Sequence, residues 1–326
     1  MKRLMFALFL AGIALCAEAY AQDSGVEVLQ IHPDFYMIAG AGGNIAVQIG
    51  PDGVVVVDAG TAEKADAVIA AIKKITDQPI RYVIDTGPDA EHVGGNEKIA
   101  KAGQTIFPLT DPNAARGALT AAMTNQGAAS ILAAENVLTR MSAPTGKASP
   151  FPTGAWPTET YNQKRTYMYM NREGIEVLHQ PAAHSDGDSM VFFRRSDVVV
   201  AGDILDTNHF PVIDLAKGGS VQGEIDALNR LLEIAIPSIP FVWQVGGTYI
   251  IPGHGRIYDQ TDVLEYRDMI VIIRDRVQDL MNKGMTLEQI KTAAPAKGYA
   301  KQYGSDSGPW TTNMFIEAVY KGLTRK

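Results

Sequence analysis

Short runs of β-branched and aliphatic residues, separated by turn residues, dominate the first quarter of the chain. Runs of this kind predict strands, and they cover residues 26–31, 35–38, 45–49, 54–57 and 80–84. Gly50-Pro51-Asp52-Gly53 has the composition of a hairpin turn between the third and fourth runs. Apolar residues at helical spacing follow Thr61, a suitable helix cap, and predict a helix over 65–76. The beginning of the chain is therefore expected to fold in the order β-β-α-β.

The stretch between residues 96 and 141 is rich in alanine and carries few strand signals. A helix is expected from Asn96, and a short strand and two further helices are expected at residues 105–107, 113–124 and 127–140. The Pro- and Gly-rich segment 143–157 is expected to form a loop.

Strands and amphipathic helices return in the second half. Strands are expected at 164–171, 175–179, 190–193, 198–200 and 248–251, and helices at 224–235 and 262–282. The segments DGVVVVDAG (52–60) and SDVVVAGDI (196–204) resemble each other, because each is a turn, a valine strand and an Asp just beyond it. This echo suggests two similar halves packed face to face, although so short a match also arises by chance in Val-rich hairpins.

The first 21 residues have the pattern of a secretory signal peptide. Lys2 and Arg3 precede an apolar run over 4–15, and Ala19-Tyr20-Ala21 is a small-x-small cleavage pattern. The run is too short to anchor the chain stably in a bilayer, and no later apolar segment reaches the ~20 residues of a membrane span. We therefore expect a periplasmic or secreted protein without an integral membrane segment, whose single domain covers residues 22–326.

Composition restricts the chemistry and the partners. Loss of the signal peptide would remove the only cysteine, Cys16, so the mature fold needs neither disulfides nor thiolate metal ligands. The formal net charge is −7, which argues against nucleic acid as a partner. A small-molecule substrate is the expected partner.

The most informative stretch is DTGPDAEHVGGN, residues 85–96, which follows a predicted buried strand. Asp89, Glu91 and His92 place two carboxylates and an imidazole within four positions. A metal ion draws such groups together because its charge offsets the repulsion between carboxylates. The alternative is a solvated acidic turn that caps the next helix.

Three further turns at strand ends carry candidate ligands. They contain His184 in AHSDGDS, Asp203 after the valine strand, and His254 in IPGHG. His209 follows Asp203 closely in a loop and is a candidate for a substrate contact or a proton donor. His32 and His179 lack supporting neighbours and are expected to be ordinary surface or core residues.

The order and spacing of these turns resemble those of the metallo-β-lactamase-fold hydrolases. The resemblance runs from residue 26 to about 280, and its most specific parts are HVGGN, AHSDGDS, VVVAGDI and IPGHG. It implies an α/β fold, namely the four-layer αβ/βα sandwich, with a one- or two-metal site between two sheets. It further implies hydrolysis of an ester, lactone, thioester or related bond by a metal-activated water.

The family's first motif is H-x-H-x-D-H, and this chain departs from it. Gly87 and Asp89 stand where the first two histidines are expected, and Glu91 replaces the aspartate. The resemblance implies two ligand groups, in which Asp203 bridges: Glu91, His92, Asp203 and His254 for one metal, and Asp89, His184 and Asp203 for the other. One firmly bound ion, or an unequal pair, is therefore expected.

The resemblance also implies roles around the metal. Zinc ranks first, with manganese or iron open, because carboxylates in place of imidazoles favour harder ions. Asp58 would lie behind the site and hold a ligating histidine in orientation. Asp203 would bridge or orient, and Asp89 or His184, if not ligating, would act as base or acid. The rival interpretation is a non-catalytic binding or accessory protein that kept the fold after losing two ligands.

Overall fold

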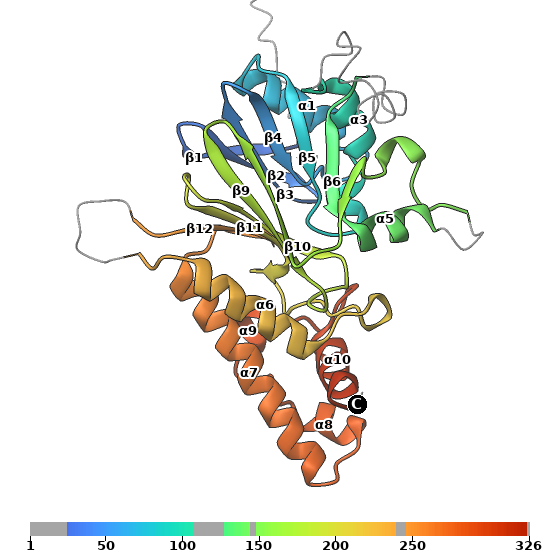
Figure 1. Ribbon diagram of the computed structural model, residues 1–326. Helices are drawn as coiled ribbons and strands as arrows, with labels where there is room; N and C mark the ends of the chain where they lie inside the picture. Colours follow the sequence, from blue (N-terminus) through green and yellow to red (C-terminus); the bar gives the residue numbers. More distant parts are fainter. Residues whose placement is uncertain (1–24, 107–126, 144–147, 239–245, 325–326) are drawn as a thin grey trace, which may run out of the picture.

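A computed structural model describes residues 25–106, 127–143, 148–238 and 246–324 (Figure 1). The predicted signal peptide, residues 1–21, and the predicted helix 113–124 lie outside the described residues. Two β-sheets face each other, and helices cover the outer face of each sheet (Figure 1).

The first sheet comes from the first half of the chain, and its seven strands lie in chain order. Strands β1 to β4 pair antiparallel, and β4 to β7 pair parallel. The strands are β1 (Glu27–His32), β2 (Phe35–Ala41), β3 (Gly43–Gly50), β4 (Gly53–Val57), β5 (Ile80–Ile84), β6 (Ser130–Ala134) and β7 (Glu159–Tyr161). The helices of this half are α1 (Ala65–Ile75), α2 (Ala90–Val93), α3 (Asn96–Ala102), α5 (Glu135–Ser142) and the short η1 (Thr153–Ala155). Helices α1 and α3 pack on the outer face of the sheet.

The second sheet comes from the second half and has five strands in the order β12-β11-β10-β9-β8. The strands are β8 (Arg165–Met170), β9 (Glu173–Gln180), β10 (Asp188–Phe193), β11 (Val198–Asp206) and β12 (Tyr249–His254). The helices are η2 (Leu215–Lys217), α6 (Val221–Ile234), α7 (Gln260–Asn282), α8 (Leu287–Ala293), α9 (Ala300–Tyr303) and α10 (Thr312–Thr324). Helix α6 packs on the outer face of this sheet against β11, and α7 and α10 pack against α6.

The valine strands show how the layers form. In β4, Val54 and Val56 pack toward the outer helices, whereas Val55 and Val57 point into the core between the sheets. Strand β11 alternates in the same way between the two cores. Each strand is buried on both faces, which is why its sequence is a continuous apolar run. Helix, sheet, sheet and helix thus make four layers, and the predicted αβ/βα sandwich is confirmed.

Several predicted elements differ from the structure. Residues 105 and 106, the described part of the strand expected over 105–107, are not in a strand. The helix expected over 127–140 is wrong in its first half: residues 130–134 form β6, and α5 begins at Glu135. Alanine favours helix, but strand pairing with β5 and β7 buries this segment on both faces and decides the outcome. The strand expected over 198–200 continues to Asp206, so that Asp203 lies within β11 and not beyond it.

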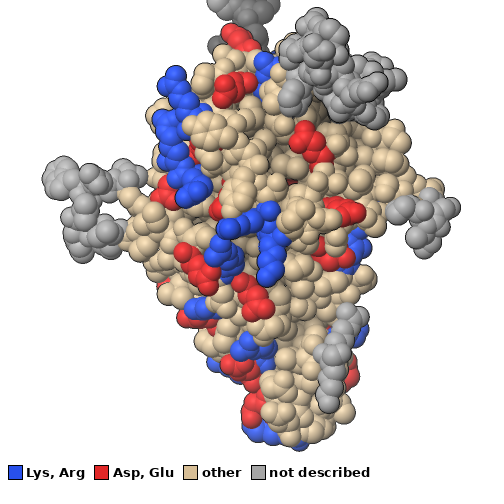
Figure 2. Space-filling view, in the orientation of Figure 1, with Lys and Arg blue, Asp and Glu red and all other residues tan. Residues whose placement is uncertain are grey.

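Acidic and basic side chains are interspersed on the face shown in Figure 2, and neither kind covers it. Mixed charges of this kind give no extended field of a single sign over that face. Within the described residues, no helix combines the length and the apolar character of a membrane span.

Candidate metal centre

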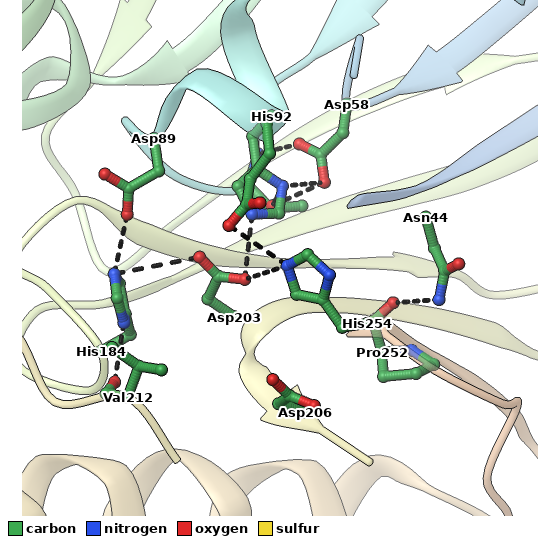
Figure 3. A network of polar contacts seen from close by, with 12 residues as sticks. Asn44, Asp58, Asp89, His92, His184, Asp203, Asp206, Val212, Pro252 and His254 are labelled. Carbon is green, nitrogen blue, oxygen red and sulfur yellow. Dashed lines mark hydrogen bonds and ion pairs between the residues drawn. The ribbon is translucent and has the colours of Figure 1, made fainter. Parts of the chain in front are cut away.

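The predicted ligands meet where the carboxyl-terminal ends of strands from both sheets come together (Figure 3). Asp89 is the N-cap residue of α2, and Glu91 and His92 lie within that short helix after β5. His184 comes from the turn between β9 and β10, Asp203 from β11, and His254 from the last position of β12. Four stretches that are distant in sequence therefore supply one cluster.

The first ligand group consists of Glu91, His92, Asp203 and His254, whose ligand atoms lie within 4.8 Å of one another. His92 Nε2 lies 3.0 Å from Asp203 Oδ1, and His254 Nε2 lies 3.6 Å from the same oxygen. Glu91 Oε1 approaches His254 Nε2 to 3.2 Å. Two imidazoles and two carboxylates at these distances are a donor set that suits Zn²⁺, Mn²⁺ or Fe²⁺.

The orientation of His92 tests whether this group fits a metal. Its Nδ1 lies 2.9 Å from Asp58 Oδ2, which also accepts the Thr86 hydroxyl at 2.7 Å. Its Nε2, although close to Asp203 Oδ1, is buried and makes no hydrogen bond to any described residue. The two atoms lie close together without hydrogen-bond geometry. A carboxylate behind Nδ1, and an Nε2 that faces a second carboxylate without a hydrogen bond, are the arrangement of a metal-binding histidine, so the first group fits an ion.

The backbone geometry allows the carboxylates of Asp58 and Asp203 to lie next to His92. Asp58 has a φ of 65°, a left-handed conformation that few non-glycine residues adopt. Gly202 has a φ of 54°, and a Cβ there would lie 2.4 Å from Thr86 Oγ1. At Gly253 a Cβ would lie 2.7 Å from Asp203 Oδ1. Glycine in the VVVAGDI and IPGHG motifs therefore makes room for Asp203 and for the hydroxyl that fixes Asp58.

The second ligand group consists of Asp89, His184 and Asp203. His184 Nδ1 lies 2.7 Å from the carbonyl oxygen of Val212, to which it donates, and its Nε2 faces Asp89 Oδ2 at 2.8 Å. Asp203 Oδ2 is farther away, at 3.8 Å from Nε2. Lys217 Nζ donates to the other oxygen of Asp89 in a very short contact.

The second group fits a metal less well than the first. Gly87 offers no side chain where the family's motif has its first histidine, and a Cβ there would meet only Asp188 Oδ1, at 3.7 Å. Asp89 is already paired on one oxygen with Lys217 and on the other with His184. No described residue supplies the two missing imidazoles, and the remaining donors pair with each other.

The charges of the site shift the pKa values of its side chains. Burial lowers the pKa of His92, but Asp203 and Asp58 outweigh it and raise that pKa well above its usual value. Burial is likewise outweighed at His184, where Asp89 and Asp203 raise the pKa to about 10. Burial raises the pKa of Asp203, but the surrounding imidazoles lower it overall. A metal ion in the first group must therefore displace protons when it binds.

The remaining predicted residues lie around this cluster. Asp58 is where the resemblance places it, behind His92. His209 lies outside both ligand groups; its side chain is 51% exposed and its Nδ1 is 3.3 Å from Asp206 Oδ2. His179 Nε2 contacts the carbonyl oxygen of Asp186 at 2.9 Å. The functional roles assigned to the site residues stay predictions.

Sequence analysis missed two residues that hold the site together. Asn44 Nδ2 donates to the carbonyl oxygens of Pro252 and Gly255, both at 3.0 Å, and so fixes the turn that carries His254 (Figure 3). The Gly-rich cluster before Asn44 was the signal, but by itself it indicates only a turn. Lys217 carries no motif signal, because its partner Asp89 is 128 positions away.

The fold and the clustered candidate ligands are those of an αβ/βα sandwich with a candidate metal centre, and comparison with known proteins identifies the family. The family model described as "Metallo-beta-lactamase superfamily" matches residues 39–254. The chain belongs to the metallo-beta-lactamase superfamily, and the predicted resemblance is confirmed.

Several known proteins are similar to the chain. A linear primary-alkylsulfatase of Pseudomonas sp. (strain ATCC 19151) is 20% identical over an alignment of 296 residues, and the match covers 83% of this chain and 54% of that protein. The structure of the inverting sec-alkylsulfatase Pisa1 from Pseudomonas sp. has a TM-score of 0.62 at 14% identity, over 91% of this chain and 50% of that one. A metallo-beta-lactamase from Pontibacter korlensis has a TM-score of 0.51 at 14% identity, over 75% of this chain and 98% of that one.

These similarities differ in what they establish. At such low identity the solved structures show the shared fold alone. The chain spans about half the length of the alkylsulfatases. Hydrolases, among them alkylsulfatases and β-lactamases, belong to this family, and the chain is in general terms a member of a metallo-hydrolase family.

Asp58→Asn is expected to weaken zinc binding by roughly 10- to 100-fold. Asp58 accepts from three donors, namely Thr86 N, Thr86 Oγ1 and His92 Nδ1. An amide keeps the size of the side chain but has one acceptor oxygen, so it frees His92 to turn or to change tautomer. Competition with a zinc-binding dye measures the affinity.

Asp66→Asn is the matched control, because Asp66 is an exposed carboxylate paired with Lys98 on the outer helices. It should bind zinc as the wild type does. A folded Asp58→Asn protein with wild-type affinity would show that Asp58 does not orient His92 for a metal.

Proposed function

We propose that the protein is a metal-dependent hydrolase that holds one metal ion in the first ligand group, formed by Glu91, His92, Asp203 and His254. The observation that carries the proposal is the buried Nε2 of His92, which has no hydrogen bond to a described residue while Asp58 holds its Nδ1. Zinc is the first candidate, and manganese and iron suit the same donors.

A metal ion bound there would polarise the scissile bond and lower the pKa of a bound water toward about 7. The chain's own residues would position the ligands and transfer protons. Asp203 directs Oδ1 to His92 and His254 and Oδ2 toward His184, so it links the two ligand groups. His184 donates through Nδ1 to a backbone carbonyl, which leaves Nε2 to carry a proton. We assign to His184, with Asp89 beside it, the transfer of that proton to the leaving group.

Sulfate esters are the first substrate class to test. Two relatives are named as alkylsulfatases, and the curated one matches most of this chain. The low identity and the missing motif histidines leave carboxylic esters, lactones and thioesters as further classes. A series of aryl and alkyl sulfates, beside neutral esters of the same alcohols, separates these classes directly.

Asp203→Ala and His254→Ala are each expected to lower zinc affinity by more than roughly 100-fold, because each removes a direct ligand where orienting residues already contribute 10- to 100-fold. Hydrolysis should fall with the metal content. Metal per chain is measured by mass spectrometry of the purified protein, and activity is measured on the ester series.

His209→Ala is the control for metal content, because His209 lies outside both ligand groups and should leave it unchanged. Hydrolysis that survives loss of the metal in Asp203→Ala would place the chemistry elsewhere. Wild-type protein with clearly less than one ion per chain, after growth in zinc, manganese and iron, would favour the rival interpretation of a non-catalytic binding protein.

We also propose that the protein is exported to the periplasm or secreted. The support is the N-terminal pattern of basic residues, apolar run and small-x-small site within residues 1–21. N-terminal sequencing of protein taken from the native cell should begin at Gln22. Protein that stays in the cytoplasm with residues 1–21 attached would contradict export.

A further inference from the structure

Lys217 brings a fixed positive charge to the second ligand group. Its ammonium is paired with Asp89 Oδ1 and lies 3.2 Å from Asp214 Oδ2. Asp89 Oδ2, on the other side, faces His184 Nε2 at 2.8 Å. One carboxylate is therefore held between an ammonium and an imidazole.

The backbone around Lys217 is held in place by several bonds. The side chain of Asp214 accepts from the backbone N–H groups of Ala216 and Lys217 and caps η2. The carbonyl oxygen of Lys217 accepts from Arg140 Nη2 at 2.7 Å and from the backbone N–H of Asp186 at 2.9 Å. Arg140 in turn pairs with both oxygens of Asp186, at 2.8 and 2.6 Å. A bidentate pair of this kind fixes geometry as well as charge.

The Lys217 segment also packs tightly against the turn that carries His184. The backbone N–H of Asp214 donates to the His184 carbonyl oxygen at 2.9 Å. A Cβ at Gly219 would lie 2.1 Å from that same oxygen, so only glycine allows this approach. Lys217 and His184 thus belong to one packed unit, which sets the ammonium against Asp89 before any ligand arrives.

We propose that the Lys217 ammonium supplies the positive charge that a second metal ion would give to Asp89 and His184, so that this ligand group binds no metal. The proposal rests on the proposed function, in which the first group holds a single ion. A cation is needed here because Asp89 and Asp203 bring two carboxylates to one imidazole. The Lys217 ammonium is part of the protein and provides this positive charge permanently. His184 then stays free of metal for the proton transfer assigned above.

The Lys217 ammonium also has a third N–H group that could contact a substrate. Among the described residues, Asp89 and Asp214 are the carboxylates that pair with this ammonium, which has three N–H donors. The side chain is 33% exposed. As part of the proposal, the third N–H of this partly exposed side chain would bind an oxygen of an incoming ester.

Metal counting on the full chain tests the proposal. Wild type, Lys217→Met and Lys217→Arg are dialysed against rising zinc, and bound ions per chain are measured. Lys217→Met should take up one ion more than wild type, with at least about tenfold higher affinity for that ion, because Asp89 loses the charge that competes with a metal. Lys217→Arg keeps the charge and should match wild type. Cobalt in place of zinc should show the extra site as a second visible absorption band.

Two further variants locate the effect. Lys217→Gln repeats the charge removal with a polar side chain, in case Lys217→Met does not fold. Adding Asp89→Asn to either variant should abolish the extra ion. A Lys217→Met or Lys217→Gln protein that binds no more metal than wild type, or a wild type that fills both groups at the same zinc concentration, would overturn the proposal. A wild type with no ion at all would contradict the proposed function alone, because the gain in the variants is measured relative to wild type.

Discussion

The hydrogen bond between the buried imidazole of His92 and the carboxylate of Asp58 is the constraint on which the site depends. It joins a helix after β5 to the end of β4, and it turns His92 Nε2 toward Asp203 on the opposite sheet. Asp58 reaches this position only through a left-handed backbone, and the Thr86 hydroxyl that fixes it fits only because Gly202 has no side chain. The strained backbone at Asp58 thus holds His92 in the orientation that a metal ligand would need.

The two ligand groups share Asp203, but they differ in the positive charge that offsets the repulsion between their carboxylates. In the arrangement that we propose, the first group holds an exchangeable metal ion. In the second group, Asp89 pairs with both Lys217 and His184, and the proposed role of Lys217 is to supply a charge that is part of the protein. A centre of this proposed kind would depend on the supply of one metal ion only, and it would keep a protonatable imidazole beside the metal.

The sequence predicted the layers better than it predicted the contacts. Val54 to Val57 are buried on both faces, so the strand is recognisable in the sequence as a continuous apolar run. The motifs around His184, Asp203 and His254 lie within or next to strands that apolar runs likewise predict. Segment 130–134 has the composition of a helix, and only pairing with two neighbouring strands makes it a strand. Lys217 was missed because its role depends on a contact with Asp89, which lies 128 positions away in the sequence, and no local pattern encodes that contact.

The central claim is that one metal ion lies between His92, His254 and Asp203 while the group around Asp89 and His184 holds none. Anomalous X-ray diffraction at the zinc edge, from crystals of the zinc-loaded protein, tests it most directly. We expect a single anomalous peak between His92, His254 and Asp203, and no peak beside Asp89, where the Lys217 ammonium lies. A second peak of comparable height between Asp89 and His184, or no peak beside His92, would contradict it.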